Sequence, residues 1–366
     1  MGEFDVAGED RTSGWRVGWR RWSAALAFAL GVILGATGTA DPAAGAPVGR
    51  HSSVPADSDL PIPGDPPDRK QPHRIDPVAV DIDAAGNLYV ADHFHPRVVK
   101  FPAGSSNGET VAGGLITGWD DDQMIELLGV AVGKDGTVYT VDRWAHRLQK
   151  WDPRTGKATV LVGCRCYAEK GRQLLEPVDV DVDDQGNVYV ADLEGHRVLQ
   201  FVPGRKKGIV VAGGNRRGDG LDQLASPEAV AVDAAGNVFV ADTGNNRIVK
   251  WAPGSTSGVV VAGGNGQGEG LDHLNFPSDV TLDAAGDLYI VDPTYDRVLR
   301  WTPGAARGVA VNRPDWFVFS DGTQRSQLRG ALDVAVDAGG TVYVVDYDAQ
   351  DVLKFVPGAS EGVPAV

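Results

Sequence analysis

The chain has 366 residues, and 42% of them are hydrophobic, which is enough to build a sizeable core. Its formal net charge of -15 argues against nucleic-acid binding, because a phosphate-binding surface should be basic. The acidic balance is expected to reflect an acidic solvated surface and slightly favours cationic partners. The two cysteines, Cys164 and Cys166, flank one residue, so they make no disulfide framework.

The N-terminal segment, residues 1–40, has the features of an export signal. Arg16, Arg20 and Arg21 precede an apolar stretch at 22–34, and small residues follow up to Ala40. The alternative is an uncleaved signal anchor, because residues 22–40 approach the length that spans a bilayer. In either case the arginines keep their side in the cytoplasm. We therefore expect an extracytoplasmic protein, secreted or anchored, that meets the membrane only through this segment.

Residues 41–75 are rich in Pro, Ala, Gly, Ser and Asp and show no apolar periodicity. This composition predicts a flexible tether.

From residue 76 onward the chain repeats itself. The sequence Gly-Asn-Val-Tyr-Val-Ala-Asp at 186–192 recurs in five further versions. The closing aspartates are Asp92, Asp142, Asp192, Asp242, Asp292 and Asp346, with a spacing of 50 residues that becomes 54 at the last step. A fixed period of this length indicates one supersecondary unit that must stack on its neighbours to bury its apolar face.

One repeat contains four short strands separated by turn residues. In the fourth repeat, alternating apolar residues predict strands at 229–232, 238–241, 247–251 and 259–262. Residues 233–237 and 242–246 contain Gly and Asn, which can take positive φ in tight turns. Four antiparallel strands form one propeller blade. The sequence therefore predicts an all-β fold, a six-bladed β-propeller over residues 76–366.

The repeat resembles the NHL-repeat family. The residues that carry the resemblance are Pro227, Ala231-Val232-Asp233, Gly236-Asn237, Val240-Ala241-Asp242 and Asn246-Arg247, and it extends over about residues 76–366. The chain is similar to the extracytoplasmic NHL domains of bacterial surface and receptor proteins, although it has no kinase motifs. The resemblance implies the fold but no single function, because the family includes interaction modules, receptor ectodomains and a few enzymes.

Two repeats depart from the pattern. The second has Leu127 where four others have proline, and the sixth has Asp351 where the other five have arginine. The sixth also ends in a shortened fourth strand at 362–366 that contains Pro364, and proline is tolerated only at a sheet edge. Blade six is therefore either finished weakly or completed by a strand from the tether.

An aspartate and an arginine bound the second turn of five repeats. The pairs are Asp92 with Arg97, Asp142 with Arg147, Asp192 with Arg197, Asp242 with Arg247, and Asp292 with Arg297. Catalysis would not need five copies around a ring. We expect these pairs to form hydrogen bonds and ion pairs that fix the turn.

One repeat position alternates between two large aromatic residues. Trp151, Trp251 and Trp301 stand there in three repeats, and Phe101, Phe201 and Phe355 stand there in the other three. These side chains are predicted to form core between blades.

Four histidines invite a metal interpretation. His146 and His196 stand at the turn position before the arginine, where other repeats have different polar residues, so we expect turn residues. His93 and His95 lie two residues apart in one turn. Some lyases with this fold bind zinc through histidines, but no residue-by-residue match exists here. A catalytic zinc would also need a third ligand, for which only His146 is available. No catalytic residue is predicted.

Carboxylates recur on the first strand of the blades, which should line the central channel. Asp179, Asp279 and Asp333 share one position near its start. Converging carboxylates could bind Ca²⁺ in the channel, as in lactonase-type propellers. The favoured alternative is that each aspartate accepts backbone N–H bonds from a neighbouring strand, with no cofactor.

Aromatic residues are distributed unevenly around the ring. The turn after the second strand offers Phe94, Trp144, Tyr295 and Tyr347, and the linkers between blades offer Trp119 and Trp316. Both segments should open on one face, and these residues belong to blades five, six, one and two. Such an arc is typical of a binding surface for a protein, peptide or glycan. The alternative is that several of them pack against neighbouring loops.

The leading functional prediction is an extracytoplasmic binding or scaffolding module for a protein or cell-wall ligand. The second is an enzyme, a cation-dependent lactonase or lyase, with its site at the channel mouth. No nucleophile–base motif or strong metal-ligand spacing favours the enzyme. The third is a structural surface protein without a small ligand.

Overall fold

The computed structural model describes residues 75–114, 116–163, 173–312, 317–318, 324–325, 327–359 and 361–366. The predicted signal or anchor at 1–40, the tether up to residue 74, both cysteines and Trp316 lie outside the described residues. In the part of the chain that is described, no helix is long and apolar enough to cross a membrane.

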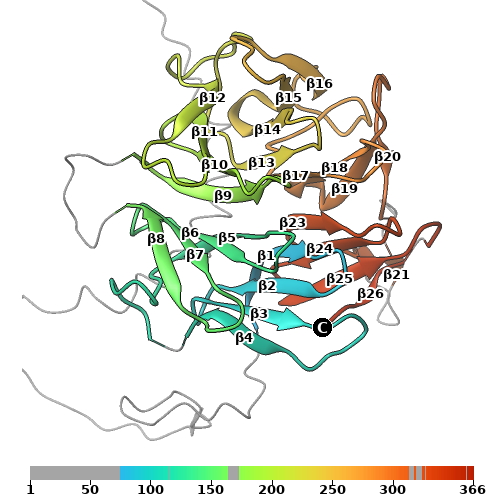
Figure 1. Cartoon of the computed structure of the whole chain (residues 1–366). Helices are drawn as coiled ribbons and strands as arrows, with labels where there is room; N and C mark the ends of the chain where they lie inside the picture. The colour runs from blue at the N-terminus through green and yellow to red at the C-terminus, as the bar shows by residue number, and fades with distance from the viewer. Residues whose placement is uncertain are drawn as a thin grey trace, which may run out of the picture. The chain divides into compact units, whose positions relative to one another are not determined.

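Six four-stranded antiparallel sheets follow one another along the chain, each built from consecutive strands (Figure 1). Blade 1 is β1 (Pro77–Ile82), β2 (Leu88–Asp92), β3 (Arg97–Phe101) and β4 (Glu109–Gly113). Blade 2 is β5 (Leu127–Val132), β6 (Val138–Asp142), β7 (Arg147–Trp151) and β8 (Ala158–Val162). Blade 3 is β9 (Pro177–Val182), β10 (Val188–Asp192), β11 (Arg197–Phe201) and β12 (Ile209–Gly213). Blade 4 is β13 (Ala229–Val232), β14 (Val238–Asp242), β15 (Arg247–Trp251) and β16 (Val259–Gly263).

Blade 5 is β17 (Asp279–Leu282), β18 (Leu288–Asp292), β19 (Arg297–Trp301) and β20 (Val309–Ala310). Blade 6 is β23 (Ala331–Val336), β24 (Val342–Asp346), β25 (Asp351–Phe355) and β26 (Val363–Pro364). A small hairpin, β21 (Phe317–Val318) and β22 (Gln324–Arg325), lies between blades 5 and 6 in the sequence. The six-bladed propeller is confirmed, and the strands of blade 4 match the predicted bounds to within one residue.

The first turn of each blade is held by an aspartate side chain. In blade 4, Asp233 Oδ1 accepts hydrogen bonds from the backbone N–H groups of Ala235 (2.9 Å) and Asn237 (2.8 Å). Gly236 takes a φ of 78°, a conformation that strains residues with a Cβ. This Asp-x-x-Gly-Asn turn directs the chain from β13 into β14, all five residues of which are buried.

The core lies between adjacent blades, where the repeated large aromatic residues pack. Trp251 of blade 4 belongs to one buried cluster with Tyr189 and Val198 of blade 3. Trp151 packs in the same way against blade 1, and Trp301 against blade 4. The six side chains at this position are at most 5% exposed. The prediction that they form core between blades is therefore confirmed.

The ring closes through contacts between blades 1 and 6. Strands β1 and β23 are neighbours, and buried residues of both blades share one hydrophobic cluster. The backbone N–H of Val80 donates to Asp333 Oδ1 at 3.0 Å, and Gln350 Nε2 donates to Asp76 Oδ1. The fourth strand of blade 6 is β26, which pairs with β25. The C-terminal residues therefore complete blade 6 with a short edge strand, and Pro364 lies at that edge.

Candidate functional site

One face of the propeller is formed by the turn that follows the second strand of each blade and by the linker that precedes the first strand. In blades 1, 2, 3 and 6 the first residue after the second strand donates its backbone N–H to the carbonyl just before the first strand. His93 bonds Asp76 (2.9 Å), Arg143 bonds Glu126 (3.0 Å), Leu193 bonds Glu176 (2.8 Å), and Tyr347 bonds Gly330 (3.0 Å). These segments therefore lie on the same side of the molecule, and we call that side the turn face.

The repeated aspartate–arginine pairs hold this face together. In all five pairs the arginine Nε donates to a carboxylate oxygen, and every one of these aspartates is fully buried. The guanidinium of Arg247 also donates to the carbonyls of Asp219 (2.8 Å) and Gly220 (3.0 Å), which lie in the linker before blade 4. Each arginine of blades 2 to 5 contacts its own linker in this way. The pairs therefore have a structural role.

Blade 6 lacks this arrangement. Asp346 and Asp351 stand directly opposite each other on β24 and β25, where the other blades place an aspartate opposite an arginine. Burial raises the pKa of both carboxyls. The turn face therefore contains one blade in which the repeated ion pair is replaced by two acids.

The histidines are placed in turns, without a metal-binding arrangement. His146 and His196 have φ values of 50° and 49°, the conformation of a tight-turn residue, and His196 Nδ1 accepts the backbone N–H of Ser226 at 3.2 Å. The imidazole of His93 bonds the backbone of Leu127 in the next blade, and burial lowers its pKa. Among the described residues, no group of three or more His, Cys, Asp or Glu side chains could hold a metal ion.

Five aspartates on the first strands of the blades link neighbouring blades, and we call them the axial aspartates. Asp179, Asp279 and Asp333 accept backbone N–H groups from the first strand of the next blade, at 2.8, 2.7 and 3.0 Å. Asp81 and Asp181, which the sequence analysis did not select, do the same for Val132 and Val232, each at 2.7 Å. These contacts favour the alternative in which the carboxylates are backbone acceptors over the Ca²⁺ site.

Burial raises the pKa of every one of these five carboxyls. The pKa of Asp81 and of Asp279 is raised to about 7 and that of Asp181 to about 6, with neighbouring aspartates as a further cause for Asp81 and Asp279. The pKa values of Asp179 and Asp333 lie well above the usual range, because burial adds to the repulsion of neighbouring axial aspartates. The axis of the ring therefore holds carboxyls that keep a proton close to neutral pH.

The six aromatic residues predicted to bind a ligand differ in exposure. Phe94 is 67% exposed and Trp144 is 46% exposed, at the same turn position of blades 1 and 2. Tyr295 is partly covered, because the Arg297 guanidinium lies 4.9 Å from its ring centre. Tyr347 and Trp119 are also partly buried, and Trp316 lies outside the described residues. The exposed aromatic surface of the turn face is therefore concentrated on blades 1 and 2 in the described part of the chain.

Four charged residues that the sequence analysis did not select interact with one another, and one of them, Glu126, accepts a hydrogen bond from Trp144. We call Glu126, Arg143, Glu176 and Glu228 the acidic cluster. Arg143 Nε donates to Glu176 Oε1 at 2.6 Å, whereas Glu126 Oε2 lies 3.9 Å from Arg143 Nε. Glu228 interacts electrostatically with both Arg143 and Glu176. Three acids from three consecutive blades thus surround a single arginine.

Two acids of the cluster have strongly raised pKa values. Burial raises the pKa of Glu126 to about 6, against the opposing effects of the Arg143 charge and a hydrogen bond from Trp144. Burial also raises the pKa of Glu228 to about 8, with Arg143 lowering it and Glu176 raising it. Groups with such pKa values gather at functional sites. A comparison of repeat positions could have found Glu228, because an acid there departs from the aliphatic pattern.

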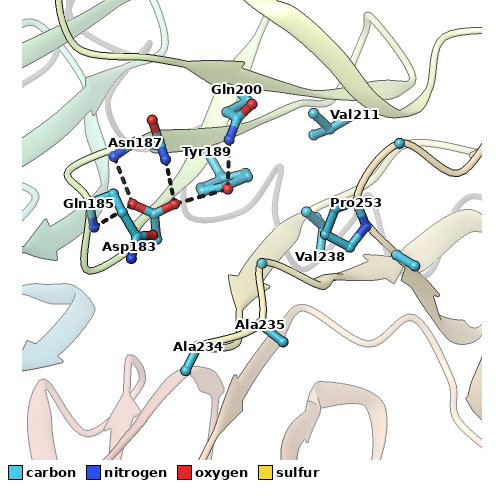
Figure 2. A pocket seen from close by; sticks show the side chains of 13 residues that line it. Asp183, Gln185, Asn187, Tyr189, Gln200, Val211, Ala234, Ala235, Val238 and Pro253 are labelled. Atoms are coloured by element: carbon cyan, nitrogen blue, oxygen red, sulfur yellow. Dashed lines mark hydrogen bonds between the residues drawn. The ribbon is translucent and has the colours of Figure 1, made fainter.

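Cavities also lie at the opposite ends of the blades, beside the first turns. One, of 290 Å³, lies between blades 3 and 4 and is lined by Asp183, Tyr189, Gln200, Val238 and Pro253 among others (Figure 2). Figure 2 shows Asp183 accepting hydrogen bonds from Gln185, Asn187 and Tyr189. Equivalent aspartates hold the first turn of other blades. These polar residues of the cavity are therefore part of the repeated turn, and they have a structural role.

The blades define the class of protein as a six-bladed β-propeller. The family model described as NHL repeat matches residues 174–201 and 224–251, in blades 3 and 4. These matches and the six-bladed fold support an NHL-repeat propeller. Comparison with curated protein sequences finds no match.

Solved structures resemble the chain at low sequence identity. A gluconolactonase from Xanthomonas campestris is 16% identical with a TM-score of 0.52, covering 73% of this chain and 82% of that chain. A catalytically inactive virginiamycin B lyase from Staphylococcus aureus, solved with quinupristin, is 11% identical with a TM-score of 0.49, covering 79% and 84%. A structure of a nidogen/laminin complex contains a chain that is 17% identical with a TM-score of 0.49, covering 64% and 78%. At these identities the likeness concerns the fold alone.

Proposed function

We propose that the propeller is an extracytoplasmic binding module that recognises a protein, peptide or glycan ligand through the turn face of blades 1 and 2. The observation that carries the proposal is the exposure of Phe94 and Trp144 at one turn position of adjacent blades. Blades 3 and 4 have Glu194 and Gly244 at that position. Large exposed aromatic residues are typical of binding sites.

The uneven ring supports binding over a purely structural role. A ring that only supports other parts of an assembly needs the same turn residues in every blade, as the five aspartate–arginine pairs illustrate. The exposed aromatics and the acidic cluster instead gather on blades 1 to 4 of one face. A ligand that contacts several blades on one side of that face would use both.

Screening of two probe sets tests the binding proposal. The full chain is applied to an array of glycans that includes peptidoglycan fragments, and to a displayed library of random 12-residue peptides. Substitutions Phe94→Ala and Trp144→Ala should each weaken the selected ligands at least tenfold without a matching loss of thermal stability. Val259→Ala, which truncates a 65% exposed side chain on the outer strand β16, is the control. Unchanged affinity in both aromatic variants would overturn the proposal.

The location outside the cytoplasm is part of the same proposal. It is supported by the arginines and the apolar stretch of residues 1–40. A reporter enzyme that is active only outside the cytoplasm, fused after residue 75, should become active in cells. Replacing the apolar stretch at 22–34 with polar residues should abolish that activity, and an inactive parent fusion would contradict export. Size analysis of the fusion distinguishes a cleaved signal from an anchor.

A second candidate function is that of an enzyme, a cation-dependent lactonase or a lyase. The observation that favours it is the pair of raised pKa values at Glu126 and Glu228, because acid–base groups work best with a pKa near the operating pH. Hydrolysis of glucono-δ-lactone by the full chain, with and without added Ca²⁺, tests the lactonase. Turnover that disappears in Glu228→Gln would favour the enzyme, and a rate equal to the background would leave the binding module.

A further inference from the structure

Three blades place a lysine ammonium over an aromatic ring of the second strand. The pairs, with the distance from the ammonium nitrogen to the ring centre, are Lys100 with Tyr89 (5.3 Å), Lys150 with Tyr139 (5.9 Å) and Lys250 with Phe239 (5.2 Å). In each pair the two residues stand directly opposite each other on the second and third strands. The π-face of an aromatic ring attracts a cation, so the fold provides the same cation position in these blades.

Acids of the first turn lie near this cation position. In blade 5 Arg300 replaces the lysine, and its Nε lies 3.4 Å from Asp287 Oδ2. In blade 2 hydrogen bonds from Thr137 lower the pKa of Asp135, and the charge of Lys150 lowers it further. The repeated cation is therefore stabilised by an aromatic ring and by the negative charge of the turn.

Blade 3 has a neutral residue at the position of the cation. Gln200 stands opposite Tyr189, and its Nε2 donates to the Tyr189 hydroxyl oxygen at 2.7 Å. That hydroxyl donates to Asp183 Oδ2 at 3.1 Å, as the Tyr89 hydroxyl does to Asp83 Oδ2 at 3.2 Å in blade 1. In the described part of the chain no lysine or arginine lies over the Tyr189 ring, and Asp183 has no cationic partner. Blade 3 thus keeps the ring and the acid but not the cation.

The cavity of 290 Å³ lies at this position of blade 3. Figure 2 shows Asp183, Tyr189 and Gln200 together on one wall, and Val238 and Pro253 of blade 4 on the other. Because one water molecule takes about 30 Å³ in the liquid, this volume accommodates a short alkyl chain with a terminal ammonium. The cavity therefore offers an acid and a ring at one side and an apolar surface at the other.

The cavity between blades 6 and 1 provides a comparison. It has a volume of 240 Å³, and its lining includes Tyr343 and Lys354, which stand opposite each other as Tyr189 and Gln200 do. No acidic residue is among its lining residues in the described part of the chain. Of the two cavities, the one beside blade 3 combines a ring and a carboxylate without a lysine of its own.

We infer that the cavity between blades 3 and 4 binds a primary alkylammonium group, which takes the position that a lysine ammonium has in other blades. The Tyr189 ring attracts the cation through its π-face and Asp183 attracts it by charge. Val238 and Pro253 contact the alkyl chain, as apolar surfaces contact lysine stems. The site lies at the opposite ends of the blades from the turn face and is separate from the proposed ligand surface there. Free amines and lysine side chains of peptides both carry this group, and the experiment distinguishes these two sources.

Titration with butylammonium chloride tests the site. The full chain is labelled with ¹³C in the rings of its eight tyrosines and followed by NMR, and the Tyr189 signal is the one that Tyr189→Phe removes. We expect this signal to shift saturably, with a dissociation constant on the order of 1–10 mM for so small a ligand. The same concentrations of sodium chloride and of 1-butanol, the neutral isostere, should leave the signal unchanged. An absent shift, or an equal shift with 1-butanol, would overturn the inference.

Gln200→Lys restores the residue that four other blades have at this position. Its own ammonium should cover the Tyr189 ring, so butylammonium should bind at least tenfold more weakly. The melting temperature should equal or exceed that of the parent chain, which shows that the variant is folded. Unchanged affinity in the folded variant would place the amine elsewhere and contradict the site.

Lys100→Gln makes the reverse change in blade 1. Asp83, Asn87 and Tyr89 are the same residue types as their counterparts in blade 3, so this variant has the same set of side chains. The Tyr89 ring signal should then respond to butylammonium in the millimolar range, whereas in the parent chain it should not. A Tyr89 ring that stays silent in the variant would count against the ring and the acid as the determinants of binding.

One further probe distinguishes the sources of the ammonium. Nα-acetyl-lysine amide carries the group on a peptide backbone, and binding at least threefold tighter than that of butylammonium would assign the site to lysine side chains. Equal or weaker binding would assign it to free amines. Trp144→Ala, on the turn face, should leave both affinities unchanged, and a loss of amine binding there would contradict two separate sites.

Discussion

Asp333 of blade 6 accepts the backbone N–H of Val80 of blade 1 at 3.0 Å, and this hydrogen bond crosses the seam at which the ring closes. Asp179 and Asp279 make the same bond to the next blade along the chain. A contact that joins consecutive blades elsewhere therefore also joins the two ends of the repeat array. Strand β26 pairs with β25 of its own blade, and the Asp333 bond contributes to holding blades 6 and 1 together.

Removing the acceptor at the seam should weaken the whole domain. Asp333→Ala leaves the Val80 N–H unpaired in a buried place, which should lower the free energy of unfolding by about 1–3 kcal/mol. Asp333→Asn keeps an acceptor oxygen without a charge and should cost about 1 kcal/mol or less. Urea unfolding followed by tryptophan fluorescence measures both. Equal losses in the two variants would contradict a role for the hydrogen bond.

The raised pKa values along the axis predict how stability depends on pH. Asp81 and Asp279 have a pKa of about 7 in the folded chain, against 3.8 for an unperturbed aspartate. Between these values the folded chain binds more protons than the unfolded chain, so stability should fall as pH rises from about 4 to about 7, and Glu228, with a pKa of about 8, continues the fall to about pH 8. Asp83 and Asp135, whose pKa values are lowered, act in the opposite direction but only at more acidic pH.

Melting temperatures at pH 5, 6, 7 and 8 test this dependence. The decline between pH 5 and pH 7 should be reduced in Asp279→Asn, since about one titrating carboxyl is removed from the proton balance. Asp184→Asn, at an exposed turn position, is the control and should leave the slope unchanged. A melting temperature that rises from pH 5 to pH 8 would contradict the prediction.

The sequence predicted those features that repeat. Six copies fix strand bounds, the aspartate–arginine pairs and the tryptophan–phenylalanine core, because each copy shows which residues the blade itself requires. The acidic cluster was missed because its members come from three blades and are far apart in the sequence. Tyr295 illustrates a second reason, since its exposure depends on where the Arg297 guanidinium lies. Side-chain cover and contacts between blades follow from tertiary packing and leave little trace in local sequence.

The arginine of a repeat pair should be costly to remove. Arg247 is 93% buried, since it is only 7% exposed, and it bonds Asp242 and two linker carbonyls. Arg247→Ala leaves a buried carboxylate unpaired and should lower the free energy of unfolding by about 3–5 kcal/mol. Arg247→Lys should recover less than half of this, because an ammonium lacks the planar fork. The exposed Arg205→Ala is the control in urea unfolding, and a loss similar to it would argue against the structural role.

The two kinds of tryptophan should respond oppositely to truncation. Trp251 is 2% exposed in the core between blades 3 and 4, so Trp251→Ala should cost about 3–5 kcal/mol of stability. Trp144 is 46% exposed, and Trp144→Ala should cost about 1 kcal/mol or less. Thermal unfolding of both variants provides the comparison. A large loss from Trp144→Ala would show that this residue is core and would remove the main support for a binding face.

Restoring the repeated aspartate–arginine pair in blade 6 should stabilise the folded domain. Asp351 stands opposite Asp346 on the neighbouring strand, and burial raises the pKa of both, so at neutral pH their ionisation opposes folding. Asp351→Arg gives Asp346 the partner that five other aspartates have, and it should raise the free energy of unfolding at pH 7 by about 1–2 kcal/mol. Asp348→Arg makes the same change of charge at the neighbouring exposed turn position. A gain in Asp351→Arg that exceeds that of Asp348→Arg would assign the effect to the pair, whereas equal gains would assign it to the net charge of the chain.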